Sequence, residues 1–191
     1  MNNVIRCPWP GKDSRMMTYH DREWGVPLHD DQGLFEFLIL DGFQAGLSWS
    51  TVLRKRDAFR VAFDGFDPEK IARYDEEKVW ALLHNPAIIR NRRKIDGAIR
   101  NARSFLTIRE QKSSFSDYIW MFTDGKTIHN HWREESQIPV TSPESDAMSK
   151  DLKHHGFSFV GSTICYAFMQ AVGLVNDHLI SCFRHRELIN H

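Results

Sequence analysis

The segment from Asp31 to Leu40 constrains the fold more than any other part of the chain. Its large apolar side chains follow one another so closely that a helix here would be apolar nearly all round: Leu34, Phe35, Phe37, Leu38, Ile39 and Leu40. A helix of this kind is stable when other elements cover all of its sides. We therefore expect a buried helix.

The segments around it carry signals for further helices. Ser48 is a candidate N-cap for a helix that reaches about Phe63, and Asp67-Pro68-Glu69 combines an N-cap, a proline at the first helical position and a first-turn acid. Other helices are expected over residues 75–84, 88–106, 115–122, 142–155 and 162–172, with a polar surface excursion over 123–140. No segment alternates with a period of two, so the sequence predicts an all-α fold, organised as a single domain over residues 1–191.

The composition narrows the class of protein. Hydrophobic residues make up 41% and charged residues 26% of the 191 residues, as in an ordinary globular protein. No apolar run approaches membrane-spanning length, the N-terminus lacks the apolar region of a signal peptide, and three cysteines cannot form a disulfide framework. We therefore expect a cytoplasmic protein. Because the net charge is +0, any affinity for nucleic acid must come from a local patch.

The stretch from Asp41 to Trp49 combines a carboxylate, two glycines and an indole. Asp41 stands near the end of the expected buried helix, Gly42 and Gly46 permit close backbone approach, and Trp49 opens the next helix. A carboxylate and an aromatic plate of this kind suit a flat, nitrogen-rich or cationic ring. The alternative is a joint between two helices in which Trp49 only fills the core, and the stretch by itself favours that alternative.

Two cysteine–histidine pairs lie near the two ends of the chain. Cys7 precedes His20, and His178 lies four residues before Cys182, a spacing that places both side chains on one face of a helical turn. Together they form a Cys2His2 set suited to tetrahedral zinc, and four protein ligands would make the site structural. The alternative is a buried thiol among scattered histidines, a serious one in a chain with 10 histidines.

A run of cations, which we call the basic stripe, lies along the expected helix over residues 88–106. It contains Arg90, Arg92, Arg93, Lys94, Arg100 and Arg103, with Asp96 as the only acid among them. Such a stripe can follow a phosphate backbone. The alternative is a solvated helix face.

Residues 156–162 join two expected helices through a short hairpin, which is the layout of a helix–hairpin–helix motif. Gly161 permits close backbone approach, and the free N–H groups at the start of the next helix suit one phosphate. An ordinary connection between two helices is the alternative. Beside the basic stripe, the hairpin makes DNA binding a reasonable hypothesis.

Taken together, these motifs resemble the bacterial 3-methyladenine DNA glycosylase I family, within the helix–hairpin–helix DNA glycosylase superfamily. The matching stretches are residues 19–27 (YHDREWGVP), 44–49 (QAGLSW), 52–56 (VLRKR), 88–92 (IIRNR), 94–95 (KI), 156–157 (GF), 159–161 (FVG) and 173–178 (GLVNDH). The resemblance runs in register from about Cys7 to Cys182. It implies excision of 3-methyladenine from alkylated DNA by hydrolysis of the N-glycosidic bond, after the nucleotide is flipped out of the helix.

The resemblance also implies roles for individual residues, by position. The ligands of a structural zinc ion would be Cys7, His20, His178 and Cys182. The aromatic residues around the base would be Trp9, Tyr19, Trp24 and Trp49, with Asp41 as the catalytic carboxylate that reads the base edge. The clamp on the DNA phosphate would be Phe159, Val160, Gly161 and Ser162. The expected partner is double-stranded DNA carrying alkylated bases, bound by a monomer that has no membrane association.

Asp41 departs from the family pattern, in which the base-reading position is typically a glutamate. Aspartate retracts the carboxylate by roughly 1.5 Å, enough to lose a direct hydrogen bond unless the backbone shifts or a water bridges the gap. Two alternatives to the main hypothesis therefore stay open: a glycosylase with a shifted substrate range, and a non-catalytic zinc-clipped module that binds DNA. A zinc hydrolase is disfavoured because four protein ligands leave no open position on the metal.

Two other acids lie near the expected site. For Asp177 the sequence favours a local role, as a partner of the zinc-binding His178 or as a helix cap. Glu36 lies five residues from Asp41 on the same helix, so the two need not share a face, and we assign it no role.

Overall fold

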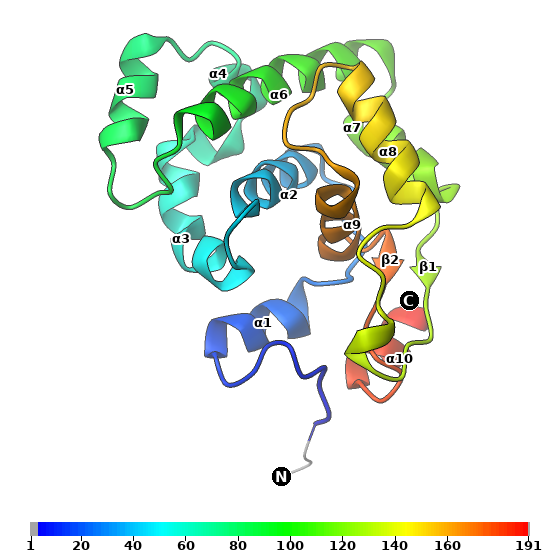
Figure 1. The fold of residues 1–191 in the computed structure, drawn as a ribbon. Helices are drawn as coiled ribbons and strands as arrows, with labels where there is room; N and C mark the ends of the chain where they lie inside the picture. Colours follow the sequence, from blue (N-terminus) through cyan, green and yellow to red (C-terminus); the bar gives the residue numbers. More distant parts are fainter. Residues whose placement is uncertain (1–3, 191) are drawn as a thin grey trace.

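The computed structural model of the protein describes residues 4–190 (Figure 1). The α-helices within this range are α1 (Ser14–Arg22), α2 (Asp31–Gln44), α3 (Trp49–Ala62), α4 (Pro68–Ile71), α5 (Glu76–His84), α6 (Arg92–Gln111), α7 (Phe115–Trp120), α8 (Pro143–His154), α9 (Ser162–Ala171) and α10 (Phe183–Ile189). Short 3-10 helices occur at η1 (Asp64–Phe66), η2 (Met121–Thr123) and η3 (Glu135–Gln137). The two-residue strands β1 (Ile128–His129) and β2 (Val175–Asn176) pair in parallel. The fold is therefore mostly helical, as predicted, with this small strand pair as an addition.

Helix α2 is the buried helix that the sequence predicted. Asp30 caps its start by accepting a hydrogen bond from the Gly33 N–H, and every residue from Leu34 to Phe43 is buried. Helices α3, α6, α7 and α9 pack against α2, which lies at the centre of Figure 1. The other helices are therefore arranged around α2, which needs apolar contacts on all of its sides.

Most helix starts follow their capping residues, and one predicted start is wrong. The side chains of Ser48, Asp67 and Asp75 each accept a hydrogen bond from the first turn of the helix that follows. Helix α6, however, begins at Arg92 and not at Ile88. The reason is Asn91, whose side chain accepts from the Lys94 N–H and so takes the N-cap position.

The two ends of the described chain lie against each other. The Phe183 N–H donates to the Ile5 carbonyl over 3.0 Å, and the chain from Ile128 to Asn130 is hydrogen-bonded through its backbone to Leu174 and Asn176. Residues 123–140, expected as a surface excursion, are thereby attached to the C-terminal segment. Among the described residues, none of the helices combines the length and hydropathy needed to cross a bilayer. That residues 1–191 form a single domain stays a prediction.

Candidate functional site

A cavity of about 420 Å³ lies where α1, α2, α3 and α9 meet. The structure brings to its wall every residue that the sequence placed around a base: Trp9, Tyr19, Trp24, Asp41 and Trp49. The rings form a contiguous aromatic cluster, with centroids 5.2 Å apart for Tyr19 and Trp49 and 5.1 Å apart for Trp9 and Trp24. Such a lining suits a flat ring with polar edges.

Asp41 is the polar group that stands out in this cavity. It is 2% exposed, and its Oδ2 atom has no hydrogen-bond partner among the described residues. Burial raises the pKa of this carboxyl well above its ordinary value, and the positive charge of Arg56 offsets only part of that rise. The indole N–H groups of Trp9 and Trp49 are also buried and have no partner in the described part of the chain. Because buried polar groups in folded proteins are nearly always paired, these atoms indicate a site for a polar ligand.

Glu36, to which the sequence gave no role, does not line the cavity. Its carboxylate accepts from Arg56 over 2.6 Å and from Arg60 over 3.0 Å. The pairing leaves Asp41 as the acid that α2 presents to the cavity.

The end of α2 that carries Asp41 is fixed by α6 and by the α8–α9 hairpin. Lys94 donates from Nζ to the carbonyls of Phe43 and Ala45, each over 2.7 Å, and so caps the C-terminus of the helix. The Cβ of Phe159 lies 3.3 Å from the position that a Cβ on Gly42 would take. A larger residue at Gly42 would clash with the hairpin. The end of α2 that carries Asp41 is therefore packed directly against the hairpin.

A second wall of the cavity was missed by the sequence analysis. Tyr166 and Gln170 of α9 line it, as do Glu135, Ile138, Pro139 and Val140, which come from the segment expected to be a surface excursion. No local pattern marks these positions, because only the packing of distant segments brings them to the cavity.

Asp177 lies behind this second wall. Its role is local, as the sequence favoured, but its partners are neither His178 nor a helix end: it accepts hydrogen bonds of 2.7–2.8 Å from four side chains, Asn130, Trp132, Tyr166 and Gln170. With 1% exposure and four donors, its carboxylate is fully occupied. It is therefore poorly placed to act as an acid or base on a sugar.

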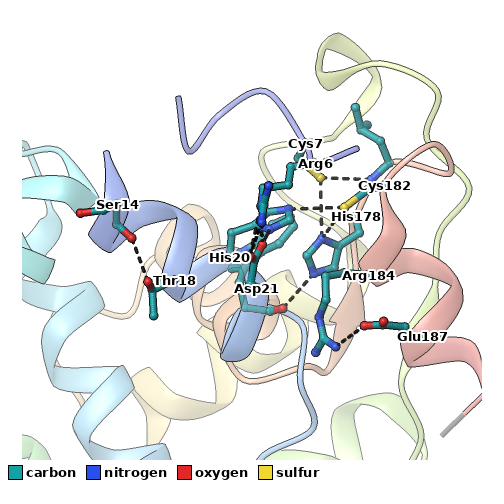
Figure 2. A network of polar contacts seen from close by, with 12 residues as sticks. Arg6, Cys7, Ser14, Thr18, His20, Asp21, His178, Cys182, Arg184 and Glu187 are labelled. Atoms are coloured by element: carbon teal, nitrogen blue, oxygen red, sulfur yellow. Dashed lines mark hydrogen bonds and ion pairs between the residues drawn. The ribbon is translucent and has the colours of Figure 1, made fainter. Parts of the chain in front are cut away.

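The Cys2His2 set forms a buried cluster that joins the N-terminal and C-terminal segments (Figure 2). The four ligand atoms all lie within 4.8 Å of one another. His178 Nδ1 is 3.7 Å from the Cys7 sulfur and 3.6 Å from the Cys182 sulfur, which is itself 3.5 Å from His20 Nε2. The expectation of a shared helical face for His178 and Cys182 was wrong: His178 lies in irregular chain, and Cys182 follows a turn as the N-cap of α10.

The outer nitrogen of each histidine in the cluster has its own partner. His20 Nδ1 lies 2.8 Å from an Asp21 oxygen, and Asp21 in turn accepts from Arg6. His178 Nε2 donates to the Trp24 carbonyl over 2.9 Å. This arrangement turns the remaining nitrogens toward the two sulfurs, as metal-binding histidines require. The donor set therefore fits a tetrahedral metal ion such as Zn²⁺.

The charge state of the cluster is also consistent with cation binding. A hydrogen bond between the two thiols lowers the pKa of Cys182 and raises that of Cys7, so one thiolate is favoured. Burial opposes ionisation of Asp21, but hydrogen bonds from Arg6 and His20 outweigh it and lower the pKa of that carboxyl.

The predicted DNA clamp lies between α8 and α9, as the helix–hairpin–helix layout requires (Figure 1). The Val160 side chain is buried and Phe159 packs on α6, so neither presents its whole side chain to solvent. Gly161 is the N-cap of α9 and provides no side-chain cap, and a Cβ built on it would meet nothing within 4 Å. The backbone at Gly161 and Ser162 is thus the accessible part of the clamp.

Comparison with known proteins agrees with this geometry. The methyladenine glycosylase family matches residues 9–185 of the chain. DNA-3-methyladenine glycosylase 1 of Escherichia coli (strain K12) is 48% identical over 177 residues, which cover 93% of this chain and 95% of that protein.

Two solved structures share the fold over nearly the whole chain. A crystal structure of a 3-methyladenine DNA glycosylase I has 50% identity and a TM-score of 0.92, covering 94% of this chain and 98% of the other. A tyrosine-to-phenylalanine variant of 3-methyladenine DNA glycosylase I in complex with 3-methyladenine has 34% identity and a TM-score of 0.91, covering 93% and 96%. The aromatic cavity and the buried Cys2His2 cluster thus belong to a chain that is a member of the methyladenine glycosylase family.

Proposed function

We propose that this protein is a DNA glycosylase that excises 3-methyladenine from alkylated double-stranded DNA by hydrolysing the N-glycosidic bond. Family membership and the similarity to a relative with that activity in its name support the proposal, as does the similarity to a structure that holds 3-methyladenine. The single observation that carries it is the unpartnered, buried carboxyl of Asp41 in an aromatic cavity.

The chemistry follows from the charge of the damaged base. Methylation at N3 makes the adenine of the nucleotide cationic and weakens its bond to the sugar, so the base is already a good leaving group. The cavity receives the flipped nucleotide, the rings of Tyr19 and Trp49 stack on the base, and Asp41 accepts a hydrogen bond from its edge. Trp9 and Trp24 complete the aromatic wall. Catalysis then consists of selecting the base and stabilising its charge.

The shorter reach of Asp41 is the specific observation that keeps the two alternatives open. The test is to incubate the pure protein with methylated duplex DNA and to identify the released bases, using the natural protein, Asp41→Ala and Asp41→Glu. We expect release of 3-methyladenine, reduced by about 10- to 150-fold in Asp41→Ala, because a hydrogen bond to a charged group contributes about 1.5–3 kcal/mol. A rise in Asp41→Glu would show that reach limits the natural protein.

The matched control is Asp57→Ala, which removes a carboxylate that is 98% exposed on α3 and should leave release unchanged. Release of a different base by the natural protein would establish a shifted substrate range. Duplex binding without release of any base would establish the non-catalytic DNA-binding module.

The proposal extends to DNA contact through the hairpin. The uncapped start of α9 offers backbone N–H groups to one phosphate, and Gly161 lets the phosphate approach. Phe159 packs on α6 and Val160 is buried, which holds the hairpin in place, and Ser162 begins the helix whose first N–H groups would receive the phosphate. The protein acts as a monomer in the cytoplasm.

We further propose that Cys7, His20, His178 and Cys182 bind a structural Zn²⁺ ion. The convergence of their four ligand atoms and the partners of both histidines support the assignment. Metal analysis of protein isolated without chelator should give about one zinc per chain. Less than about half a zinc per chain would contradict it.

The zinc ion should contribute to stability and not to base selection. Cys182→Ala should lower the temperature of unfolding far more than it alters the ratio of bases released. Cys165→Ala is the matched control, because Cys165 is equally buried but lies outside the cluster, and it should retain zinc. A change of base selectivity at normal stability would contradict a purely structural role.

A further inference from the structure

The structure separates the basic stripe into cations that are already used and cations that are free. Lys94 is buried against the carbonyls of Phe43 and Ala45. Arg92 is held by Glu76 over 2.7 Å and by Asp96 over 3.0 Å. The stripe is therefore not a uniform positive surface.

Arg93 and Arg100 remain exposed and close to the hairpin. Together with Asp96, Ser158 and Phe159 they line an open hollow of about 460 Å³. Because they are seven residues apart on α6, their side chains lie on the same face of the helix. Arg93 has no ion-pair partner within residues 4–190, and Arg100 only donates to the Ser158 hydroxyl over 3.1 Å.

The acid in this hollow is neutralised by another residue. Both oxygens of Asp96 accept from Arg92, over 3.0 and 3.1 Å. The two free guanidinium groups therefore face solvent with little opposing charge, although the net charge of the chain is +0. Local positive charge of this kind is what an otherwise neutral protein needs to attract a phosphate backbone.

The hollow is bordered by the α8–α9 hairpin, which is hydrogen-bonded to α6. Asn101 of α6 makes two hydrogen bonds with the backbone of Ser158, of 2.7 and 3.0 Å. The ring of Phe159 packs so closely on α6 that a Cβ at Gly97 would lie only 2.8 Å from it. These contacts fix the position of α6, and so of its two arginines, relative to the start of α9. The arginine pair therefore continues the surface at which the proposed phosphate clamp lies.

We propose that Arg93 and Arg100 form a second phosphate-binding site for the DNA duplex, beside the hairpin and separate from the clamp at the start of α9. This inference rests on the proposed function, because it takes the partner to be duplex DNA. Each guanidinium would make charge-assisted hydrogen bonds to a backbone phosphate. The Ser158 hydroxyl, which now accepts from Arg100, can rotate to donate to the same phosphate.

The salt dependence of duplex binding tests the proposal. The double variant Arg93→Ala/Arg100→Ala should reduce the slope of log Kd against log salt concentration by about 1.8, since each phosphate contact contributes about 0.9. At low salt its affinity for a short duplex should fall by about tenfold or more. Replacement of both residues by lysine should restore most of the slope, because the charge is retained.

Arg109→Ala is the matched control, because Arg109 is an exposed cation on the same helix that pairs with Glu69 away from the hollow. It should leave the slope unchanged. A second control is the affinity for free 3-methyladenine, followed by tryptophan fluorescence, which the double variant should retain.

An unchanged slope in the double variant would overturn the proposal, as would failure of the natural protein to bind any duplex. An equal loss in Arg109→Ala would also overturn it, because the effect would then come from total charge. The proposed function fails separately: a natural protein that binds duplex with the expected slope but releases no base leaves the arginine site intact.

Discussion

Asp41 lines the aromatic cavity and Asp177 lies behind its wall; both are buried carboxyls, and the protein surrounds them in opposite ways. Asp177 is 1% exposed and receives four hydrogen bonds from neutral donors on two segments of the chain, the loop after β1 and helix α9. Asp41 is 2% exposed, and its Oδ2 atom receives none among residues 4–190. The two carboxyls are therefore similarly buried but differ greatly in the number of hydrogen bonds that they accept.

The difference separates an acid with a structural role from one that we propose to bind the base. A carboxylate with four donors holds its surroundings in one arrangement, and here it orients Tyr166 and Gln170 on the cavity wall. A carboxyl without a partner makes the folded protein less stable and is expected where a ligand supplies the missing hydrogen bond. For these two acids, the number of hydrogen-bond partners is thus a better guide to function than burial or charge.

The largest expected effect is on the Asp177 side of the comparison. Asp177→Ala leaves four donors unpaired, so we expect the free energy of unfolding to fall by about 3–5 kcal/mol. Urea unfolding followed by circular dichroism measures this change. The exposed-acid variant Asp57→Ala should change it by less than about 0.5 kcal/mol. A loss as small as that of the control would remove the distinction between the two acids.

A smaller effect of opposite sign is expected on the Asp41 side. Asp41→Asn replaces an unpartnered buried carboxyl by a neutral amide of the same shape, so the free energy of unfolding should rise by about 1 kcal/mol near pH 7. The same unfolding experiment measures it. A clear loss of stability would show that Asp41 has a structural partner after all.

The smallest effect is the pH dependence of that gain. Burial raises the folded-state pKa of Asp41 above the unfolded value of 3.8, so the folded protein binds this proton more tightly than the unfolded chain does. The carboxyl therefore costs no stability below about pH 3.8 and progressively more as the pH rises toward the folded-state pKa.

The stability difference between Asp41→Asn and the natural protein should accordingly shrink as the pH falls from about 7 to about 4. Unfolding curves of both proteins over this range measure it, and the other titrating groups are common to the two. A constant difference would mean that Asp41 is solvated and titrates normally.

Much of the fold was predictable because its signals are local. Ser48, Asp67 and Asp75 each cap the helix that follows them, and a capping hydrogen bond depends only on residues within one turn. The same locality explains the error at α6, where Asn91 was overlooked as an N-cap. The apolar run of α2 predicted burial without any knowledge of what covers the helix.

The site was predictable in a different way. Resemblance to the family placed Trp9, Tyr19, Trp24, Asp41 and Trp49 around a base, and the structure brings all of them to one cavity. The spacing of His178 and Cys182 suggested a helical turn, but their convergence comes from an irregular turn before α10. Their ligand atoms meet because the two ends of the described chain pack together, which no spacing rule states.

The sequence by itself determined the helical class, the buried helix and the residue types of the cavity and of the Cys2His2 cluster. Only the tertiary structure decided which polar groups have partners. It gives Asp177 hydrogen-bond partners but leaves Asp41 Oδ2 without one among residues 4–190. It pairs Lys94 with backbone carbonyls and Arg92 with acids, and leaves Arg93 and Arg100 exposed. The physical reason is that hydrogen-bond satisfaction depends on atoms contributed by segments far apart in the chain, whereas caps and apolar patterns are set within a few residues.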